Sequence, residues 1–210
     1  MCMIQHDMNA EEKIFEAAQD VFIQKGFDGA RMQDIAEKAG LNKALLHYYY
    51  RTKERLFNAI FAKVFSHFIP KVVVFIESDA TLFEKIEFFV HNYIDVIIKN
   101  PYIPNFILNE LNRNPDNIAK LLGEVTSDVR SNAFLKFKEL IKSEIVKGNI
   151  KPIEPEQLIV NMLALCIFPF VAKPILQVVL FNGDKKDYQE FLIRRKKEVT
   201  EFIINSLKNS

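Results

Sequence analysis

A basic, tyrosine-rich stretch near residue 45 is the part of the sequence best suited to contacting a nucleic acid. Between residues 38 and 55, five basic side chains stand against one acidic side chain, which leaves a local charge of +4. The basic residues are Lys38, Lys43, Arg51, Lys53 and Arg55. The whole chain carries only +1, so neutralisation of phosphates would be confined to this patch. Tyrosines 48–50 cannot all be buried on one helix, and outward phenols can bond phosphate oxygens.

Residues able to support catalysis or bind a metal are sparse. Glu87 and His91 are four residues apart and could share a metal ion, but no third ligand is evident, and a surface pair is the simpler interpretation. Cys2 and Cys166 have neither disulfide nor metal spacing, and Cys166 lies in an apolar run that favours an inert thiol. There is no glycine-rich phosphate loop and no nucleophile elbow. We therefore expect no catalytic residue, no cofactor, no metal and no enzymatic activity.

The composition predicts a globular, all-α protein of about nine helices. Of its 210 residues, 49% are hydrophobic and 26% are charged, which excludes a disordered chain. The 6 glycines and 8 prolines fall mostly between runs of helical period, and strand signals are nearly absent. The expected helices are about 10–25, 32–39, 43–49, 53–69, 80–99, 101–111, 115–147, 155–180 and 185–207.

Helix start and stop signals divide the chain into two parts. Asn9 can cap the first helix, and Gly26 supplies its stop. Thr52 can cap the fourth helix, which we expect to end or kink at Pro70. The predicted domains are a small N-terminal unit, residues 1–52, and a larger helical body, residues 53–210, with no flexible linker between them.

The most apolar segment, 155–180, is too short for a membrane span. Residues 157–172 form an uncharged run of 16, whereas a span needs about 20. Pro169 and Pro174 each free a helical carbonyl, at Leu165 and Phe170, which needs another partner. We therefore expect a buried helix or a subunit interface and no membrane association. The first ten residues lack the apolar stretch of a signal peptide, so a cytoplasmic location is expected.

The spacing from Met32 to Tyr49 satisfies the packing requirements of a helix-turn-helix. Two short helices that cross closely need a small residue at the crossing, and Ala36 supplies it. The turn needs a residue that tolerates positive φ, and Gly40 supplies it. The residues expected to bury beneath the two helices are Ile35, Ala39, Leu41, Leu46 and Tyr49.

The segment 39–56, AGLNKALLHYYYRTKERL, resembles the signature of the tetracycline-repressor (TetR) family. Positions that match common family choices are Ala39, Gly40, Lys43, Leu46, Tyr48, Tyr49, Lys53, Glu54 and Leu56. The resemblance covers about residues 9–57, and the rest of the chain fits by length and helical character. The positions that depart from the usual pattern are Ala30, Arg31, Asn42, Ala44, His47 and Tyr50, where Tyr50 replaces a phenylalanine and is expected to pack inward.

The resemblance implies a DNA-binding role for the helix near residues 43–49, which would enter the major groove. Asn42, Lys43, Ala44 and Leu45 would then face the bases. Lys43 suits guanine O6 and N7, whereas Ala44 and Leu45 suit a thymine methyl group. The remaining predicted DNA contacts, mostly to phosphates, are Arg31, His47, Tyr48, Tyr49, Thr52 and Lys53.

The resemblance also implies a homodimer, formed through the last two helices, and a small-molecule effector pocket in the helical body. The candidate pocket residues are Phe65, Phe89, His91, Tyr93, Asn105, Phe106, Asn109, Phe134 and Phe168. Aromatic rings would suit an apolar or aromatic effector. The expected function is a ligand-responsive transcription regulator, a repressor released from a palindromic operator. The alternatives are a ligand-binding protein or enzyme with a vestigial DNA-binding fold, and a DNA-binding protein that needs no effector.

Overall fold

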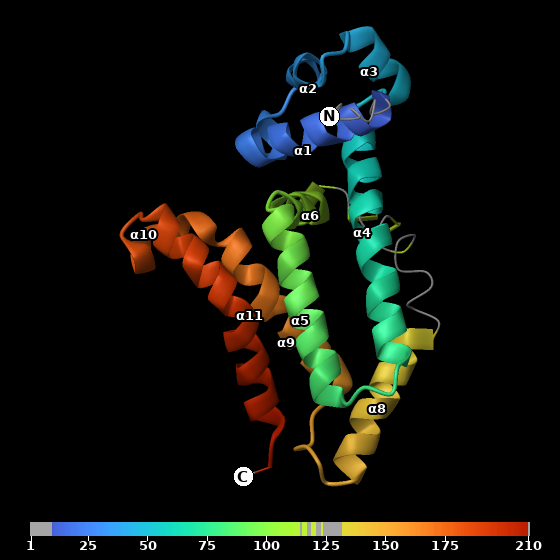
Figure 1. Ribbon diagram of the computed structural model, residues 1–210, viewed down its shortest axis with the longest axis vertical. Helices are drawn as coiled ribbons and strands as arrows, with labels where there is room; N and C mark the ends of the chain where they lie inside the picture. The colour runs from blue at the N-terminus through green and yellow to red at the C-terminus, as the bar shows by residue number, and fades with distance from the viewer. Residues whose placement is uncertain (1–9, 114, 117–118, 121–122, 124–131, 210) are drawn as a thin grey trace, which may run out of the picture. The chain divides into compact units, whose positions relative to one another are not determined.

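The computed structural model describes residues 10–113, 115–116, 119–120, 123 and 132–209 (Figure 1). All regular elements in these ranges are helices, so the predicted all-α class is confirmed, with ten helices where about nine were expected. The chain divides into two compact units, Met1–Val64 and Phe65–Ser210. The division falls within the fourth helix, because the first turns of that helix pack in the core of the first unit.

The first unit contains α1 (Ala10–Gly29), α2 (Met32–Ala39), α3 (Lys43–Tyr49) and the first turns of α4 (Lys53–Glu77). The bounds of α2 and α3 are those predicted. In α1, Gly26 leaves the helical conformation (φ 68°, ψ 173°), so the main helix stops there as expected. The expected cap Asn9 lies outside the described residues. Fully buried side chains of the core are Ile14, Ala18, Phe22, Ile35, Leu46, Leu56 and Phe57.

The second unit is built around α5 (Leu82–Lys99), which packs against α8, α9 and α11 (Figure 1). The other helices of this unit are α6 (Ile103–Arg113), α8 (Phe134–Val146), α9 (Pro155–Val171), α10 (Lys173–Phe181) and α11 (Lys185–Leu207). A capping box starts α5, since Thr81 and Glu84 bond each other's backbone N–H. Of the helix expected at 115–147, α8 is the C-terminal part, and residues 117–118, 121–122 and 124–131 lie outside the described residues.

The prediction that the fourth helix ends or kinks at Pro70 was wrong about its end, because α4 continues to Glu77. Pro70 is exposed, whereas Phe65, Phe68 and Val72 on the same helix are buried. A proline inside a helix removes one backbone hydrogen bond. Burial of apolar side chains on both sides of Pro70 offsets that loss, and the local breaker signal is overridden.

The helix expected at 155–180 is two helices, α9 and α10, which bend by 76° at Ala172. The bend follows Pro169 and precedes Pro174, which occupies the first turn of α10, where proline is tolerated. Pro169 has no N–H for the carbonyl of Leu165, and Arg195 Nη2 donates to that oxygen at 2.8 Å. The Leu165 carbonyl, which we expected to need another partner, is therefore bound by a side chain of α11.

Two parts of the described chain are apolar enough to be tested as membrane spans. By length and composition α4 passes, and α9 with α10 passes only if the bent pair counts as one span. Core helices of globular proteins pass the same test. Within α4, Phe57 and Phe61 are buried in the first unit, and Phe68 and Val72 are buried in the second.

Candidate nucleic-acid interface and effector cavity

The turn between α2 and α3 has the backbone geometry that the sequence predicted. Gly40 is left-handed (φ 67°, ψ 29°), a conformation that favours glycine. The Leu41 N–H donates to the Ala36 carbonyl at 3.0 Å, which closes the end of α2. Ile35 and Ala36 are buried beneath the turn, and Leu46 anchors α3 from the other side. The crossing of the two helices is thus fixed by buried apolar contacts.

The start of α3 presents its side chains outward. Asn42 caps the helix, since its Oδ1 accepts the Leu45 N–H at 2.7 Å. Asn42, Lys43 and Ala44 are exposed, whereas Leu45 is half-buried. This first turn has the polar and apolar groups that base edges require.

The three tyrosines separate into outward and inward groups. Tyr48 is 82% exposed and Tyr49 is 44% exposed, so the prediction that Tyr49 is buried under the helix pair was wrong. Tyr50 turns inward as expected: its hydroxyl donates to Glu11 Oε1 at 2.7 Å, and its ring lies 5.8 Å from that of Phe15. Burial and the Glu11 carboxylate both raise the pKa of Tyr50. Two phenols therefore remain for phosphate oxygens.

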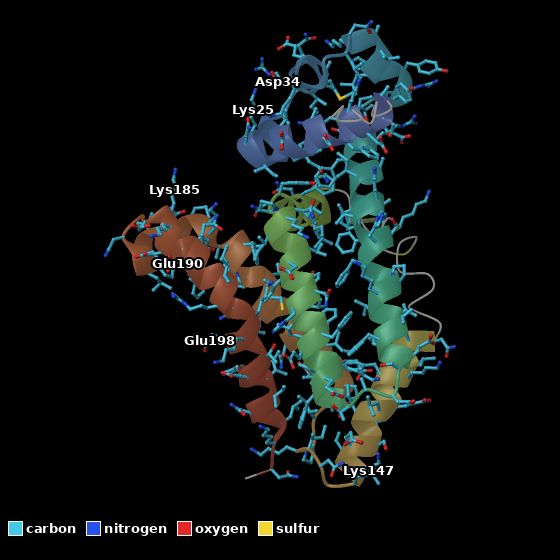
Figure 2. The ribbon with its side chains drawn as sticks, in the orientation of Figure 1. Lys25, Asp34, Lys147, Lys185, Glu190 and Glu198 are labelled. Carbon is cyan, nitrogen blue, oxygen red and sulfur yellow. The ribbon has the colours of Figure 1, made fainter. Side chains whose placement is uncertain are left out.

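Two ion pairs join α1 to α2, and one of them compensates a cation of the basic patch. Lys25 contacts Asp34 at 2.8 Å (Figure 2), and the hydrogen bond from Lys25 holds the pKa of Asp34 below its usual value. Lys38 contacts Asp20 at 3.0 Å. Lys38 is therefore compensated within the unit. Apart from Lys38, the exposed cations on α3 and next to it in sequence are Arg31, Lys43, Arg51 and Arg55.

Lys53 occupies a position that its type alone does not reveal. Its ammonium donates to three carbonyls at the end of α1, those of Phe27 at 2.6 Å, Asp28 at 3.3 Å and Ala30 at 3.1 Å. It also lies 4.4 Å from the centre of the Phe27 ring. Next to it, Thr52 Oγ1 accepts the Arg55 N–H and caps α4. These contacts favour a role for Lys53 in joining α1 to α4; its predicted phosphate contact stays a prediction.

We expect Lys53→Met to lower the free energy of unfolding by about 1.5–3 kcal/mol, because hydrogen bonds from a charged donor are lost while the aliphatic stem remains. Chemical denaturation followed by circular dichroism measures this change. Lys43→Met, on an exposed side chain, is the matched control and should stay within about 0.5 kcal/mol of the parent. Unchanged stability of Lys53→Met with weakened DNA binding would instead assign Lys53 to a phosphate.

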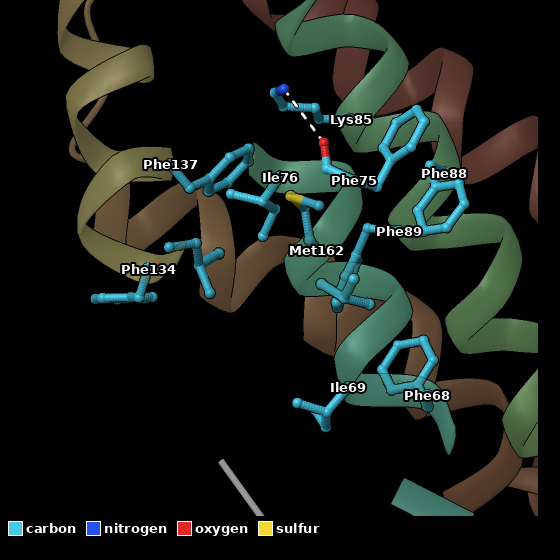
Figure 3. A pocket seen from close by; sticks show the side chains of 12 residues that line it. Phe68, Ile69, Phe75, Ile76, Lys85, Phe88, Phe89, Phe134, Phe137 and Met162 are labelled. Atoms are coloured by element: carbon cyan, nitrogen blue, oxygen red, sulfur yellow. Dashed lines mark hydrogen bonds between the residues drawn. The ribbon is translucent and has the colours of Figure 1, made fainter. Parts of the chain in front are cut away.

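A cavity of about 130 Å³ lies within the second unit, between α4, α5, α8 and α9 (Figure 3). Six phenylalanines line it: Phe68, Phe75, Phe88, Phe89, Phe134 and Phe137. The aliphatic part of its described wall is formed by Ile69, Val72, Ile76, Ile159 and Met162. Phe75 and Phe88 stack at 4.1 Å between ring centres, which ties the end of α4 to α5.

Two of the nine predicted pocket residues, Phe89 and Phe134, line this cavity. Tyr93 stacks on Phe89 at 5.3 Å, while Phe65 and Phe106 are buried elsewhere in the unit. Phe168 is 60% exposed and lines a separate hollow. For these residues and for His91, Asn105 and Asn109, a ligand contact stays a prediction. Four lining phenylalanines were missed: Phe68, Phe75, Phe88 and Phe137. Phe68 and Phe75 are seven residues apart on one face of α4, but the predicted helix ended at residue 69, before Phe75.

The wall carries one charged residue among those described, Lys85, which is only 5% exposed. Its ammonium donates to the carbonyls of Ser78 at 2.6 Å and Phe75 at 3.3 Å, where α4 ends. Burial lowers the pKa of Lys85. The side chain therefore places its stem along the cavity and its charge on the end of α4.

Comparisons with known proteins agree with this arrangement. The family described as bacterial regulatory proteins, tetR family, matches residues 14–60. The transcriptional regulator RutR of Escherichia coli O157:H7 is 31% identical over 153 residues, 72% of this chain and 70% of RutR. The structure of the regulator FadR from Bacillus subtilis, in complex with stearoyl-CoA, superposes with a TM-score of 0.65 at 16% identity, covering 93% of this chain and 98% of FadR. HlyIIR, a hemolysin II transcriptional regulator, has a TM-score of 0.62 at 18% identity, with 96% and 98% covered. The chain belongs to the tetR family of bacterial regulatory proteins.

Proposed function

We propose that this transcription regulator reads DNA through the first turn of α3. Lys43, Ala44 and Leu45 would contact base edges in the major groove, and Asn42 would add its carboxamide NH2. Tyr48, Tyr49, His47 and Arg31 would hold phosphates on either side. The single observation that carries the proposal is the exposure of Lys43 and Tyr48 on a short helix anchored by buried Leu46.

Fluorescence anisotropy of the purified protein on the DNA upstream of its own gene tests this assignment. A shuffled duplex of equal composition is the control, and both are titrated across salt. We expect a preference of about 10³ or more for the upstream duplex. Lys43→Ala should reduce that preference about tenfold to hundredfold, since a base contact is lost. Tyr48→Phe should weaken binding to both duplexes by a similar factor, since a phosphate contact carries no sequence information.

Glu77→Gln, on an exposed residue of α4 in the second unit, is the matched control and should leave both affinities unchanged. A preference that Lys43→Ala does not reduce would remove α3 from base reading. Equal, weak and strongly salt-dependent binding to several candidate operators would favour the other class of function, a ligand-binding protein or enzyme that retains the DNA-binding fold. The relatives of this chain are named as regulators, and we propose no enzymatic activity for it.

We further propose that the cavity between α4, α5, α8 and α9 takes a small apolar effector that releases DNA, as in a repressor acting in the cytoplasm. The cavity touches the C-terminal half of α4, and the N-terminal turns of α4 follow directly on the α3 reader in sequence. An effector that favours one position of α4 would shift the population away from the DNA-binding form. The same duplex then serves to screen compounds for release.

Dimerisation through α9, α10 and α11 is proposed from apolar side chains that the single chain leaves exposed. They include Phe168, Ile175, Val178, Val179, Ile193 and Phe202, each at least 60% exposed. Within the described chain, Arg195 Nε is buried beside this surface without a hydrogen-bond partner. A second copy would cover the apolar side chains and bring a second α3 to a palindromic operator.

A further inference from the structure

We infer that the effector cavity selects an uncharged molecule about the size of one aromatic ring and rejects acids and amines of the same size. The inference rests on the proposed effector role of the cavity and adds the chemical class of the ligand. It comes from the volume of the cavity, the chemistry of its wall and the hydrogen bonds of the one charged residue in that wall.

The volume sets the size of the ligand. The cavity measures about 130 Å³. Apolar protein cavities of about 150 Å³ lined by Leu, Ile and Phe stay dry and bind benzene. A single ring with one small substituent therefore fills the space between the described walls.

The wall sets the polarity of the ligand. Among the described lining residues, all but Lys85 are apolar, and phenylalanines from α4, α5 and α8 face the space (Figure 3). Ring edges and faces contact an aromatic ligand favourably in offset or edge-on geometry. A charged group placed against the same wall loses its hydration without gaining a hydrogen bond, which is strongly unfavourable.

Lys85 does not change this conclusion, because its ammonium group is already hydrogen-bonded to backbone carbonyls. Its ammonium holds the carbonyls of Phe75 and Ser78, at 3.3 and 2.6 Å, where α4 ends. To reach a ligand carboxylate, the ammonium would have to leave both acceptors; the Ser78 carbonyl would lose this hydrogen bond, whereas the Phe75 carbonyl would keep the one from the Ser78 hydroxyl at 2.7 Å. Only the aliphatic stem of Lys85 is offered to the ligand.

Calorimetric titration with toluene, benzoate and benzylammonium at neutral pH tests the inference on the intact protein. The three probes share one ring and differ in charge. We expect toluene to bind about a hundredfold or more tightly than either ion. Lys71→Met, on an exposed residue of α4 outside the cavity wall, is the control and should leave the affinity for toluene unchanged within about threefold. Lys85→Met, which keeps the stem length and removes the charge, should not lower the affinity for benzoate.

Two cavity-filling variants show where toluene binds. Val72→Phe and Ile159→Phe place an added ring in the space from α4 and from α9, and each should weaken toluene binding at least tenfold while circular dichroism confirms the helical fold. Two variants are used because overpacking by one of them can unfold the unit.

Three results would overturn the inference: no binding of toluene to the parent protein, toluene binding that neither filling variant weakens, or benzoate binding within tenfold of toluene that Lys85→Met abolishes. The last would make Lys85 a counter-ion for an acidic ligand. A separate anisotropy titration of the protein–DNA complex with toluene tests the effector role itself. Toluene that binds in the cavity but leaves DNA bound would support the ligand class and contradict the proposed release mechanism.

Discussion

Phe57→Ala is expected to destabilise the DNA-reading unit by about 3–5 kcal/mol, enough to unfold a marginal domain. Phe57 is fully buried in the first turns of α4. Its ring meets Phe22 edge-on at 5.3 Å (66° between planes) and Phe27 at 5.3 Å (87°). Phe22 and Phe27 lie on either side of Gly26 in α1, so the three rings join α4 to both segments of α1. The cavity left by alanine would therefore lie between α1 and α4.

The measurement for Phe57→Ala is denaturant unfolding combined with DNA binding. Because α2 and α3 have few buried residues of their own, loss of the Phe57 cluster should abolish DNA binding at a temperature where the second unit keeps its helical signal. Phe57→Leu is the matched control: it retains most of the apolar volume and should cost less than half as much. Full DNA binding by Phe57→Ala at 37 °C would show that the α1–α3 unit is held by other contacts.

Local signals were sufficient to predict the helix-turn-helix, because each of its requirements is met by neighbouring residues. Gly40 must accept positive φ, Asn42 must cap α3, and Leu46 must be apolar, and all three follow from short-range rules. The structure bears out each of them. The bounds of α2 and α3 were therefore predicted correctly.

Features that depend on tertiary contacts were beyond the reach of the same rules. The sequence places Pro70 as a breaker, but the burial of Phe68 and Val72 that keeps α4 intact depends on helices distant in sequence. The end of α9 is similar: the prolines indicate a freed carbonyl, but only the fold shows that Arg195 binds it. Context overrides local propensity at both points.

Long-range placement also explains why the candidate sites were predicted unevenly. Side chains on the first turn of α3 project outward wherever α3 packs, so their exposure could be inferred locally. The cavity wall comes from four helices separated by up to about ninety residues, and only Phe89 and Phe134 of the nine candidates reach it. Lys53 and Lys85 are examples of contacts that local sequence rules did not predict. The Lys53 ammonium binds carbonyls at the end of α1, and the Lys85 ammonium binds carbonyls at the end of α4.

Phe202→Glu is expected to convert a dimer to monomers and to lower affinity for the full operator by about 10²–10⁴. Phe202 is 66% exposed on α11 and lines the same hollow as Phe168 and Arg195. In a twofold interface the substitution places a carboxylate in the apolar surface of each copy, so the dimer is destabilised at two positions. A monomer loses the effective concentration that links two half-sites, and the affinity falls toward that of one recognition helix.

Sedimentation equilibrium and anisotropy on the same samples measure both effects of Phe202→Glu. Asn112→Glu is the matched control, since it adds the same charge to an exposed position of α6, a helix outside the proposed interface. It should leave both the mass and the affinity unchanged. A Phe202→Glu protein that remains dimeric would place the interface on other helices. A monomer that keeps full affinity for the operator would show instead that one copy of α3 is sufficient for recognition.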